Sequence, residues 1–128
     1  MMISELAFWG CFGLAVELCF TALRDLIIHR RLSLVGHTSL LMFPIYAIGL
    51  SYGFDFIGWL IEDDIIRYLT YPFWIWGVEL LVGIPAVKKG IRIWDYSYLP
   101  RILHWRGIIS FAHYPLWVGF GILVELIK

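Results

Sequence analysis

The sequence predicts an all-α, polytopic integral membrane protein with four transmembrane helices arranged as two tandem hairpin repeats. Three observations support this fold class. Of the 128 residues, 61% are hydrophobic and 18% are aromatic, and the mean hydropathy of +0.81 is too high for a soluble domain of this size. The charged residues cluster at the ends of apolar runs, and two segments of the chain match each other at a constant offset.

The four predicted spans cover residues 3–23, 38–61, 66–87 and 108–127, and residues 1–128 are expected to form a single transmembrane bundle. Each run is close to the roughly 20 residues that cross the hydrocarbon core of a bilayer. The first span lacks a basic leader and a clear cleavage site, which favours a retained helix over a signal peptide. The connection 88–107 mixes arginines with aromatic side chains, so we expect it to lie along the membrane interface.

The positive charges predict the orientation. Eight of the ten Lys and Arg residues fall in the first and third connections, which leaves Arg67 and Lys128 on the other side. The positive-inside rule therefore places both basic connections in the cytoplasm and both termini on the non-cytoplasmic side. The expected partners are membrane lipids and, because four short helices enclose little volume, further copies of the chain. The charges form no surface for nucleic acid.

An internal repeat relates the two halves of the chain. Gly36, Ser39 and Pro44 match Gly107, Ser110 and Pro115 at an offset of 71, and Tyr46 has Trp117 as its aromatic equivalent. The segment 16–18 matches 78–80 at an offset of 62. The two offsets differ because the connection between the two spans is longer in the second half than in the first. Each half is therefore predicted to be a two-span hairpin of the same orientation, as in transporters built from parallel repeats.

Two acids inside apolar runs, Glu17 and Glu79, are the main functional candidates. A charged and unpaired carboxylate at mid-bilayer costs at least about 2.5 kcal/mol, so such residues are functional hypotheses by default. Glu17 shares a helical stripe of small and polar residues that should face the bundle interior. Both acids are expected to converge at the cytoplasmic side near further candidate ligand-binding residues, which are Ser39, Asp95, Tyr96, Ser97, Arg106, Ser110 and His113.

Three functions fit this pattern. The favoured one is transport or small-ligand binding through a cytoplasm-side polar pocket, in which the acids bind a cation or proton, or hold an arginine or a polar headgroup. The first alternative is an intramembrane lipid-modifying enzyme, with Asp95, His104 or His113 as acid or base. The second is a non-catalytic membrane scaffold or accessory subunit.

In the scaffold interpretation the acids only anchor loops to helices. Glu17 would pair with Arg24 or Thr21, and Glu79 with Arg106 or Tyr96. No catalytic residue is assigned, because the chain contains no phosphate-binding loop, no G-x-S-x-G and no H-E-x-x-H. No cofactor is expected, and no metal site either, since no second His or Cys lies at ligand spacing around His113.

Several short motifs resemble one known family. They are Glu17 followed by Thr21 and Ala22, the opening of the second span at 36–46, Glu79, and the sequence Trp-Asp-Tyr-Ser at 94–97, which is the most specific. In these motifs the chain resembles the CmpB-like type IV ABC-transporter membrane protein family, which includes the transmembrane protein 229 group. The resemblance covers most of the chain. It implies a small polytopic helical membrane protein, and the family label implies a role in transport. The chain has no ATPase domain and almost no soluble tails, in which it departs from longer members.

Overall fold

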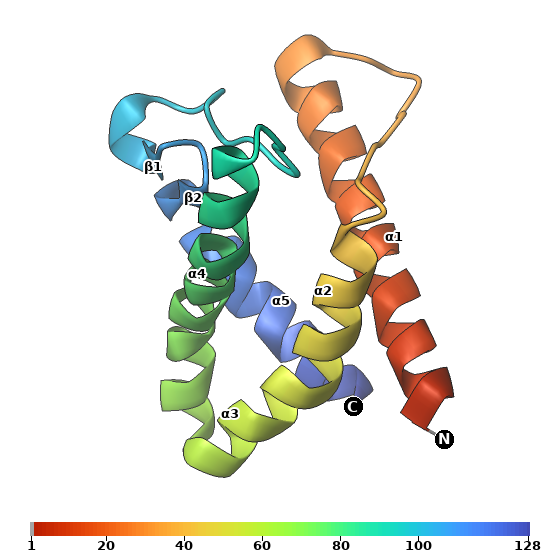
Figure 1. Cartoon of the computed structure of the whole chain (residues 1–128), viewed down its shortest axis with the longest axis vertical. Coiled ribbons are helices and arrows are strands. Elements are labelled where there is room, and N and C mark those ends of the chain that lie inside the picture. Colours follow the sequence, from red (N-terminus) through yellow and green to blue (C-terminus); the bar gives the residue numbers. More distant parts are fainter. Residues whose placement is uncertain (1) are drawn as a thin grey trace. The chain divides into compact units, whose positions relative to one another are not determined.

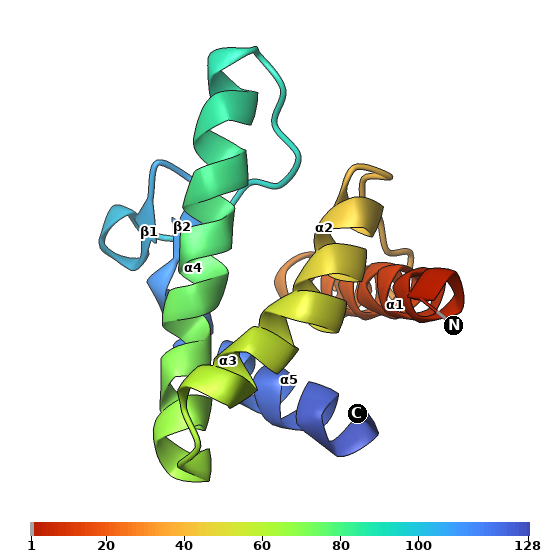
Figure 2. The same cartoon turned by 60° about the horizontal axis from the view of Figure 1, so that its bottom comes forward.

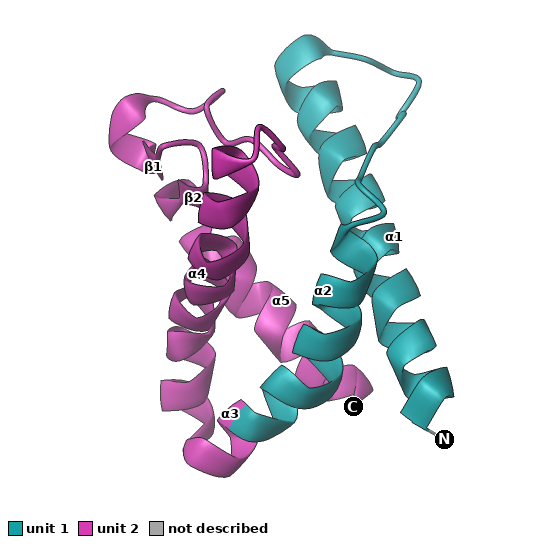
Figure 3. Cartoon of the chain, in the orientation of Figure 1, with its two compact units in different colours: residues 1–56 teal, residues 57–128 magenta. Residues whose placement is uncertain are grey.

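The computed structural model describes residues 2–128 and divides the chain into two compact units, Met1–Phe56 and Ile57–Lys128 (Figure 3). Both units are mostly helical, as the predicted fold class requires. Within residues 2–128 the sheet structure is confined to one antiparallel pair of two-residue strands, β1 (His104–Trp105) and β2 (Ile109–Ser110). The sequence did not predict this pair.

In the first unit, helix α1 (Met2–His29) continues well beyond the predicted end at residue 23. It stops where Arg30 adopts a left-handed φ of 50°, a conformation that commonly ends helices. Helix α2 (Met42–Ile48) begins later than the predicted residue 38, because the Ser39 hydroxyl and carbonyl accept hydrogen bonds from the amides of Leu41 and Met42. Figure 1 shows α1 and α2 side by side.

Helix α2 runs without interruption into a π-helical turn, η1 (Gly49–Gly53), and then into α3 (Phe54–Leu60). Gly49 and Gly53 have the spacing of small residues that often allows close helix approach, yet a Cβ at either position would meet no atom within 4 Å. The two glycines instead bound the π-helical turn. Glycine weakens a regular helix, which favours such a local change of winding at this point.

In the second unit, helix α4 (Asp64–Lys88) begins at Asp63, whose side chain accepts a hydrogen bond from the Ile66 amide. After a long loop come a 3-10 turn, η2 (Arg101–Leu103), strands β1 and β2, a second 3-10 turn, η3 (Phe111–His113), and helix α5 (Tyr114–Ile127). The predicted start of the last span at residue 108 is therefore too early. Pro115 explains the later start, because proline is tolerated only in the first turn of a helix.

The two units use glycine and tyrosine differently to bring their helices together. In the first unit Gly13 of α1 faces Tyr46 of α2, and a Cβ on that glycine would lie 2.0 Å from the tyrosine Cγ. In the second unit the tyrosine is on the first helix: Tyr71 of α4 is 1% exposed, and a Cβ on Gly121 of α5 would lie 2.2 Å from its ring. Figure 2 shows α4 and α5 from a second direction.

Two of the helices in residues 2–128, α1 and α4, are long and apolar enough to cross a membrane. The apolar run Phe111–Ile127 is shorter. Large apolar side chains are exposed along both long helices, for example Ile27 at 77% and Leu81 at 76%. Exposed apolar surface of this extent is unfavourable in water and suits contact with lipid.

Candidate functional site

The Glu17 carboxylate in the first unit is held by two neutral hydroxyl groups. Thr38 Oγ1 donates to Glu17 Oε2 at 2.7 Å, and the Tyr46 hydroxyl donates to Glu17 Oε1 at 3.0 Å. The tyrosine comes from α2, and it reaches the acid because its ring packs against Gly13, one turn earlier on α1. The structure gives Glu17 no ion pair within residues 2–128. The acid is therefore oriented through both oxygens without being neutralised.

The next turn of α1 attaches the loop that carries Thr38. Thr21 Oγ1 lies 2.8 Å from the His37 amide nitrogen and 3.0 Å from the His37 carbonyl oxygen, so this hydroxyl can bridge both groups. Gly36 makes the approach possible, because a Cβ there would lie 2.0 Å from the Leu18 carbonyl oxygen. The loop is thus held directly against the helix, which fixes the position of Thr38 beside Glu17.

The predicted partners of the Glu17 carboxylate are wrong. Arg24 pairs with Asp25 at 3.3 Å and contacts His37 Nε2 at 3.1 Å. The Thr21 hydroxyl contacts the backbone carbonyl of Glu17, at 3.0 Å, and not its carboxylate. A hydroxyl one turn along a helix bonds easily to the carbonyl four residues before it, which explains this difference.

Glu79 in the second unit is buried, with 7% of its surface exposed. It lies on the face of α4 that also carries Trp76 and Gly83, three residues before it and four after it. The Trp76 indole donates to the Ser110 carbonyl oxygen at 3.2 Å, and a Cβ on Gly83 would lie 2.7 Å from the Ile108 side chain. This face of α4 therefore packs against the strand that precedes α5.

Three polar side chains follow one another at the start of α5. Ser110 is fully buried, and the rings of His113 and Trp117 have centroids 6.2 Å apart. Ser110 Oγ and Trp117 Nε1 are buried and make no hydrogen bond with any residue from 2 to 128. Such atoms are uncommon inside native proteins, and a bound water or ion is one explanation for them.

The Trp-Asp-Tyr-Ser motif shapes the long loop of the second unit. Asp95 Oδ1 accepts from the Ser97 amide at 2.9 Å and from Arg92 at 3.4 Å. The Tyr96 amide donates to the Gly107 carbonyl at 2.9 Å. Gly107 has a φ of +68°, and a Cβ there would lie 2.5 Å from the aspartate oxygen. The motif therefore closes a loop that only glycine can complete at this position.

Hydrogen bonds set the electrostatics of Asp95. Partial burial raises the pKa of its carboxyl group, but hydrogen bonds from the Ser97 side chain and amide, with the positive charge of Arg92, outweigh this effect. The net result is a lowered pKa, so the group is a poor proton carrier near neutral pH. His104 Nδ1 is also engaged, because the Gly107 amide donates to it at 2.9 Å.

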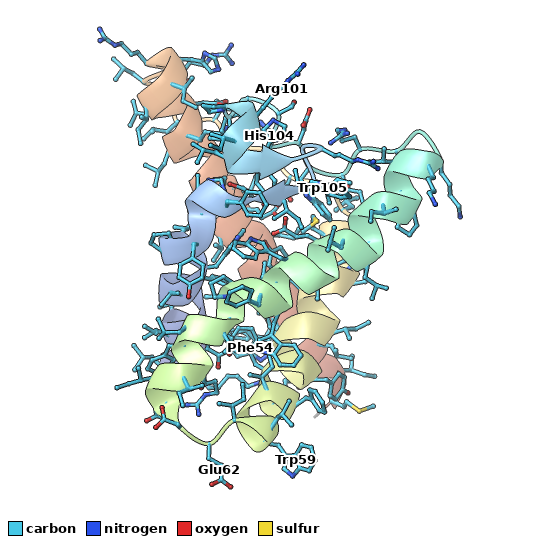
Figure 4. The ribbon with its side chains drawn as sticks, turned by 90° about the vertical axis from the view of Figure 1, so that its left-hand side faces the viewer. Phe54, Trp59, Glu62, Arg101, His104 and Trp105 are labelled. Atoms are coloured by element: carbon cyan, nitrogen blue, oxygen red, sulfur yellow. The ribbon has the colours of Figure 1, made fainter. Side chains whose placement is uncertain are left out.

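The same loop carries exposed basic and aromatic side chains. The Arg106 guanidinium lies over the Trp105 ring, 4.8 Å from its centroid. Figure 4 shows Arg101, His104 and Trp105 on this loop, with Arg101 extending away from the ribbon. The Tyr96 ring lies 5.3 Å from that of His113. The pairing of Glu79 with Arg106 or Tyr96 stays a prediction.

The predicted site residues thus fall into separate groups. Glu17 has its own partners in the first unit, and Ser39 serves the start of α2. Sequence reasoning missed the hydrogen bond from Tyr46 to Glu17 and the burial of the Trp117 indole, although the predicted repeat pairs these two residues at an offset of 71. No family model, curated protein or solved structure matches this chain.

Proposed function

We propose that the protein binds a proton or a small cation at Glu17, on the cytoplasmic side of a membrane. One observation carries the proposal: both oxygens of this carboxylate accept hydrogen bonds from neutral hydroxyls, and no basic side chain from residue 2 to 128 pairs with it. Hydroxyl donors orient a carboxylate but leave its charge. In an apolar helix the compensating charge must then come from a bound proton or cation.

The proposal includes four membrane spans. Helices α2, η1 and α3 together run from Met42 to Leu60, which at 1.5 Å per residue is roughly 28 Å. The run Phe111–Ile127 is somewhat shorter, at roughly 25 Å. Both lengths approach the roughly 30 Å of a bilayer core. With the basic connections in the cytoplasm, both termini lie on the non-cytoplasmic side, and lipids and further copies of the chain are the expected neighbours.

The tandem hairpin arrangement is supported by equivalent contacts. Thr21 meets His37 in the first unit. At the offsets of 62 and 71 the equivalent residues are Gly83 and Ile108, and these also lie against each other. The same helix position therefore meets the same loop position in both units. Membership of the CmpB-like family and a role in transport belong to this proposal, and they rest on the short motifs around Glu17, Glu79 and 94–97.

The enzyme alternative has no comparable support. Two of its three candidates, Asp95 and His104, accept hydrogen bonds that hold the long loop, and His113 is the third. The lowered pKa of Asp95 also makes that carboxyl group a weak general acid or base near neutral pH. The scaffold alternative differs from the proposal in one measurable property, which is whether Glu17 exchanges a proton or a cation.

Infrared difference spectroscopy of the protein in liposomes tests the proposal. We expect the carboxyl carbonyl band to change on titration with acid or with a monovalent or divalent cation. The band should be lost in Glu17→Gln. Glu5→Gln is the matched control, because Glu5 lies on the same helix in an exposed first turn. If the parent and Glu17→Gln give the same difference spectrum, the binding proposal fails and the scaffold interpretation replaces it.

A further inference from the structure

The indole groups of the second unit are not equivalent. Trp76 Nε1 donates to the Ser110 carbonyl oxygen at 3.2 Å, and Trp94 Nε1 donates to the Ile108 carbonyl oxygen at 2.9 Å. Trp117 Nε1 is buried as well, but no residue from 2 to 128 accepts its proton. An indole N–H is a donor only, so its burial without an acceptor is unfavourable. Burial of Trp117 Nε1 without an acceptor among residues 2–128 therefore favours an acceptor supplied by a bound molecule.

A second buried group without a hydrogen bond within residues 2–128 is the Ser110 hydroxyl, seven residues before Trp117. Ser110 is fully buried, and its hydroxyl makes no hydrogen bond within residues 2–128, although its backbone carbonyl accepts from Trp76. From Ser110 the chain reaches His113 and Trp117 in steps of three and four, through η3 and the first turn of α5. The His113 and Trp117 rings lie 6.2 Å apart, centroid to centroid. Ser110 ends β2, which meets α4 through Trp76, and α5 meets α4 where Gly121 lies against Tyr71. The two unsatisfied groups therefore lie on segments that both pack against α4.

Helix α4, which packs against β2 and α5, carries a hydrogen-bond acceptor. Glu79 lies on α4 between Trp76, which contacts Ser110, and Gly83, which contacts Ile108. Its carboxylate is buried on this face, and a carboxylate can accept several hydrogen bonds at once. The packing of α4 against β2 and α5 thus brings together two donors, at Ser110 and Trp117, and one acidic acceptor.

The geometry points to a binding site in the second unit for a small neutral hydroxyl group, which accepts from Trp117 and Ser110 and donates to Glu79. The chemistry excludes the other classes of ligand. A metal cation cannot accept the indole proton, and an anion would be repelled by the carboxylate. A bare proton would satisfy Glu79 but not Trp117. Water and the hydroxyl of a polyol share the required chemistry, and the experiment separates them.

The test uses the full chain, labelled with nitrogen-15 in its indole groups, in phosphocholine micelles free of polyol. Trp117→Phe assigns the Trp117 resonance by its loss. If water occupies the site, the Trp117 indole proton shows a magnetisation-exchange cross-peak to water, whereas those of Trp76 and Trp94 do not. If a polyol hydroxyl is preferred, added glycerol shifts the Trp117 resonance in a saturable way and leaves Trp76 and Trp94 unmoved. Either result supports the site.

The inference is overturned if Trp117 shows no water cross-peak, no glycerol shift and the same slow exchange as Trp76 and Trp94. It is also overturned if the only cross-peaks are to acyl chains. Ser110→Ala and Glu79→Gln should each reduce the water or glycerol response several-fold, while the Trp94 resonance reports that the unit is still folded. Should a variant unfold, the parent chain alone decides. The readout is confined to the second unit, so it stands or fails independently of cation binding at Glu17.

Discussion

Each of the two units carries an acid in the second half of a long helix, but the side chains around the two acids differ. In the first unit Thr38 and Tyr46 donate hydroxyl protons to Glu17. At the equivalent positions the second unit has Ile109 and Trp117, so one donor is lost and the other becomes an indole. The first acid is therefore held by two hydroxyl groups, whereas the second unit has an indole and an aliphatic side chain at these two positions.

The same contrast extends to the contact between helix and loop. In the first unit a hydroxyl, that of Thr21, bonds to the backbone of His37. In the second unit Gly83 leaves space that the Ile108 side chain fills. A polar contact fixes the loop by hydrogen bonding, and an apolar one fixes it by close packing. The comparison shows that a loop can be attached to its helix in two ways, and that the local side chains decide which.

The largest expected effect concerns a third acid, at the far end of the second unit. Arg67 bonds to Glu125 and also pairs with Asp64 at 2.7 Å, with its side chain 11% exposed. Its guanidinium further donates to the Ile61 and Glu62 carbonyls. Here, unlike at Glu17, a basic residue of the chain neutralises the acid. Arg67→Met should lower the free energy of unfolding by about 3 kcal/mol, because Glu125 loses its partner while still largely buried.

Denaturation of the purified protein in mixed micelles, with increasing anionic detergent, measures this change. The double variant Arg67→Met, Glu125→Met is the control, since replacing both members of a buried pair by apolar groups is often close to neutral. A single variant as stable as the parent would contradict the prediction. It would mean that the charge of Glu125 reaches water and needs no partner.

A smaller effect should come from the two glycine and tyrosine contacts, which are reversed between the units. Gly13→Ala and Gly121→Ala each place a methyl group against a tyrosine ring, so both should be destabilising by about 1–3 kcal/mol. Gly49→Ala is the matched control, because nothing lies within 4 Å of its added Cβ. Alanine is favoured over glycine in a helix by up to about 1 kcal/mol, so the control should be neutral or stabilising. The same micelle denaturation compares the stabilities of all three variants. Equal stabilities would contradict the prediction, because they would show that the helices can move apart to accommodate the methyl group at little cost.

Much of this arrangement follows from the sequence. The apolar runs predicted a mainly helical protein. The steps of three and four predicted that one stripe of the first span faces the interior, and two glycines of that stripe, Gly10 and Gly13, lie against aromatic rings of α2. Segment ends were harder. Arg30 ends α1 through its backbone conformation and Pro115 delays α5, and neither effect shows in hydropathy. Periodicity also gave no indication of the strand pair at 104–110, because two-residue strands have too few side chains to form a pattern.

The partners of the acids could not be predicted for a different reason. Opposite charge suggested Arg24 for Glu17, but Arg24 has a nearer acid in Asp25. The true donor, Tyr46, is 29 residues away and reaches Glu17 only because Gly13 lets the helices approach. Such a pairing depends on the distance between two helices, which a single sequence does not contain. The predicted repeat offered one usable signal, since it pairs Tyr46 with Trp117.

The smallest expected effect is a difference between the two loops in how their amide hydrogen exchange depends on pH. The pKa of Asp95 lies below its ordinary value of 3.8, so this group stabilises the folded loop above that pH. The contribution should be lost as the pH falls through the lowered pKa, because protonation weakens the bonds from Ser97 and Arg92. In the first unit the Leu41 amide donates to the Ser39 hydroxyl, which does not titrate in this range. Amide hydrogen exchange between about pH 5 and about pH 2 should therefore show a loss of protection at Ser97 and none at Leu41.

Asp95→Asn provides the control for this difference. An asparagine can still accept a hydrogen bond from the Ser97 amide, but it carries no charge for Arg92 and does not titrate. Protection at Ser97 should then be lower at neutral pH and independent of acid. If Ser97 in the parent is equally insensitive to pH, the amide bond to Asp95 contributes nothing, and Gly107 alone, through its positive φ, determines how the second loop closes.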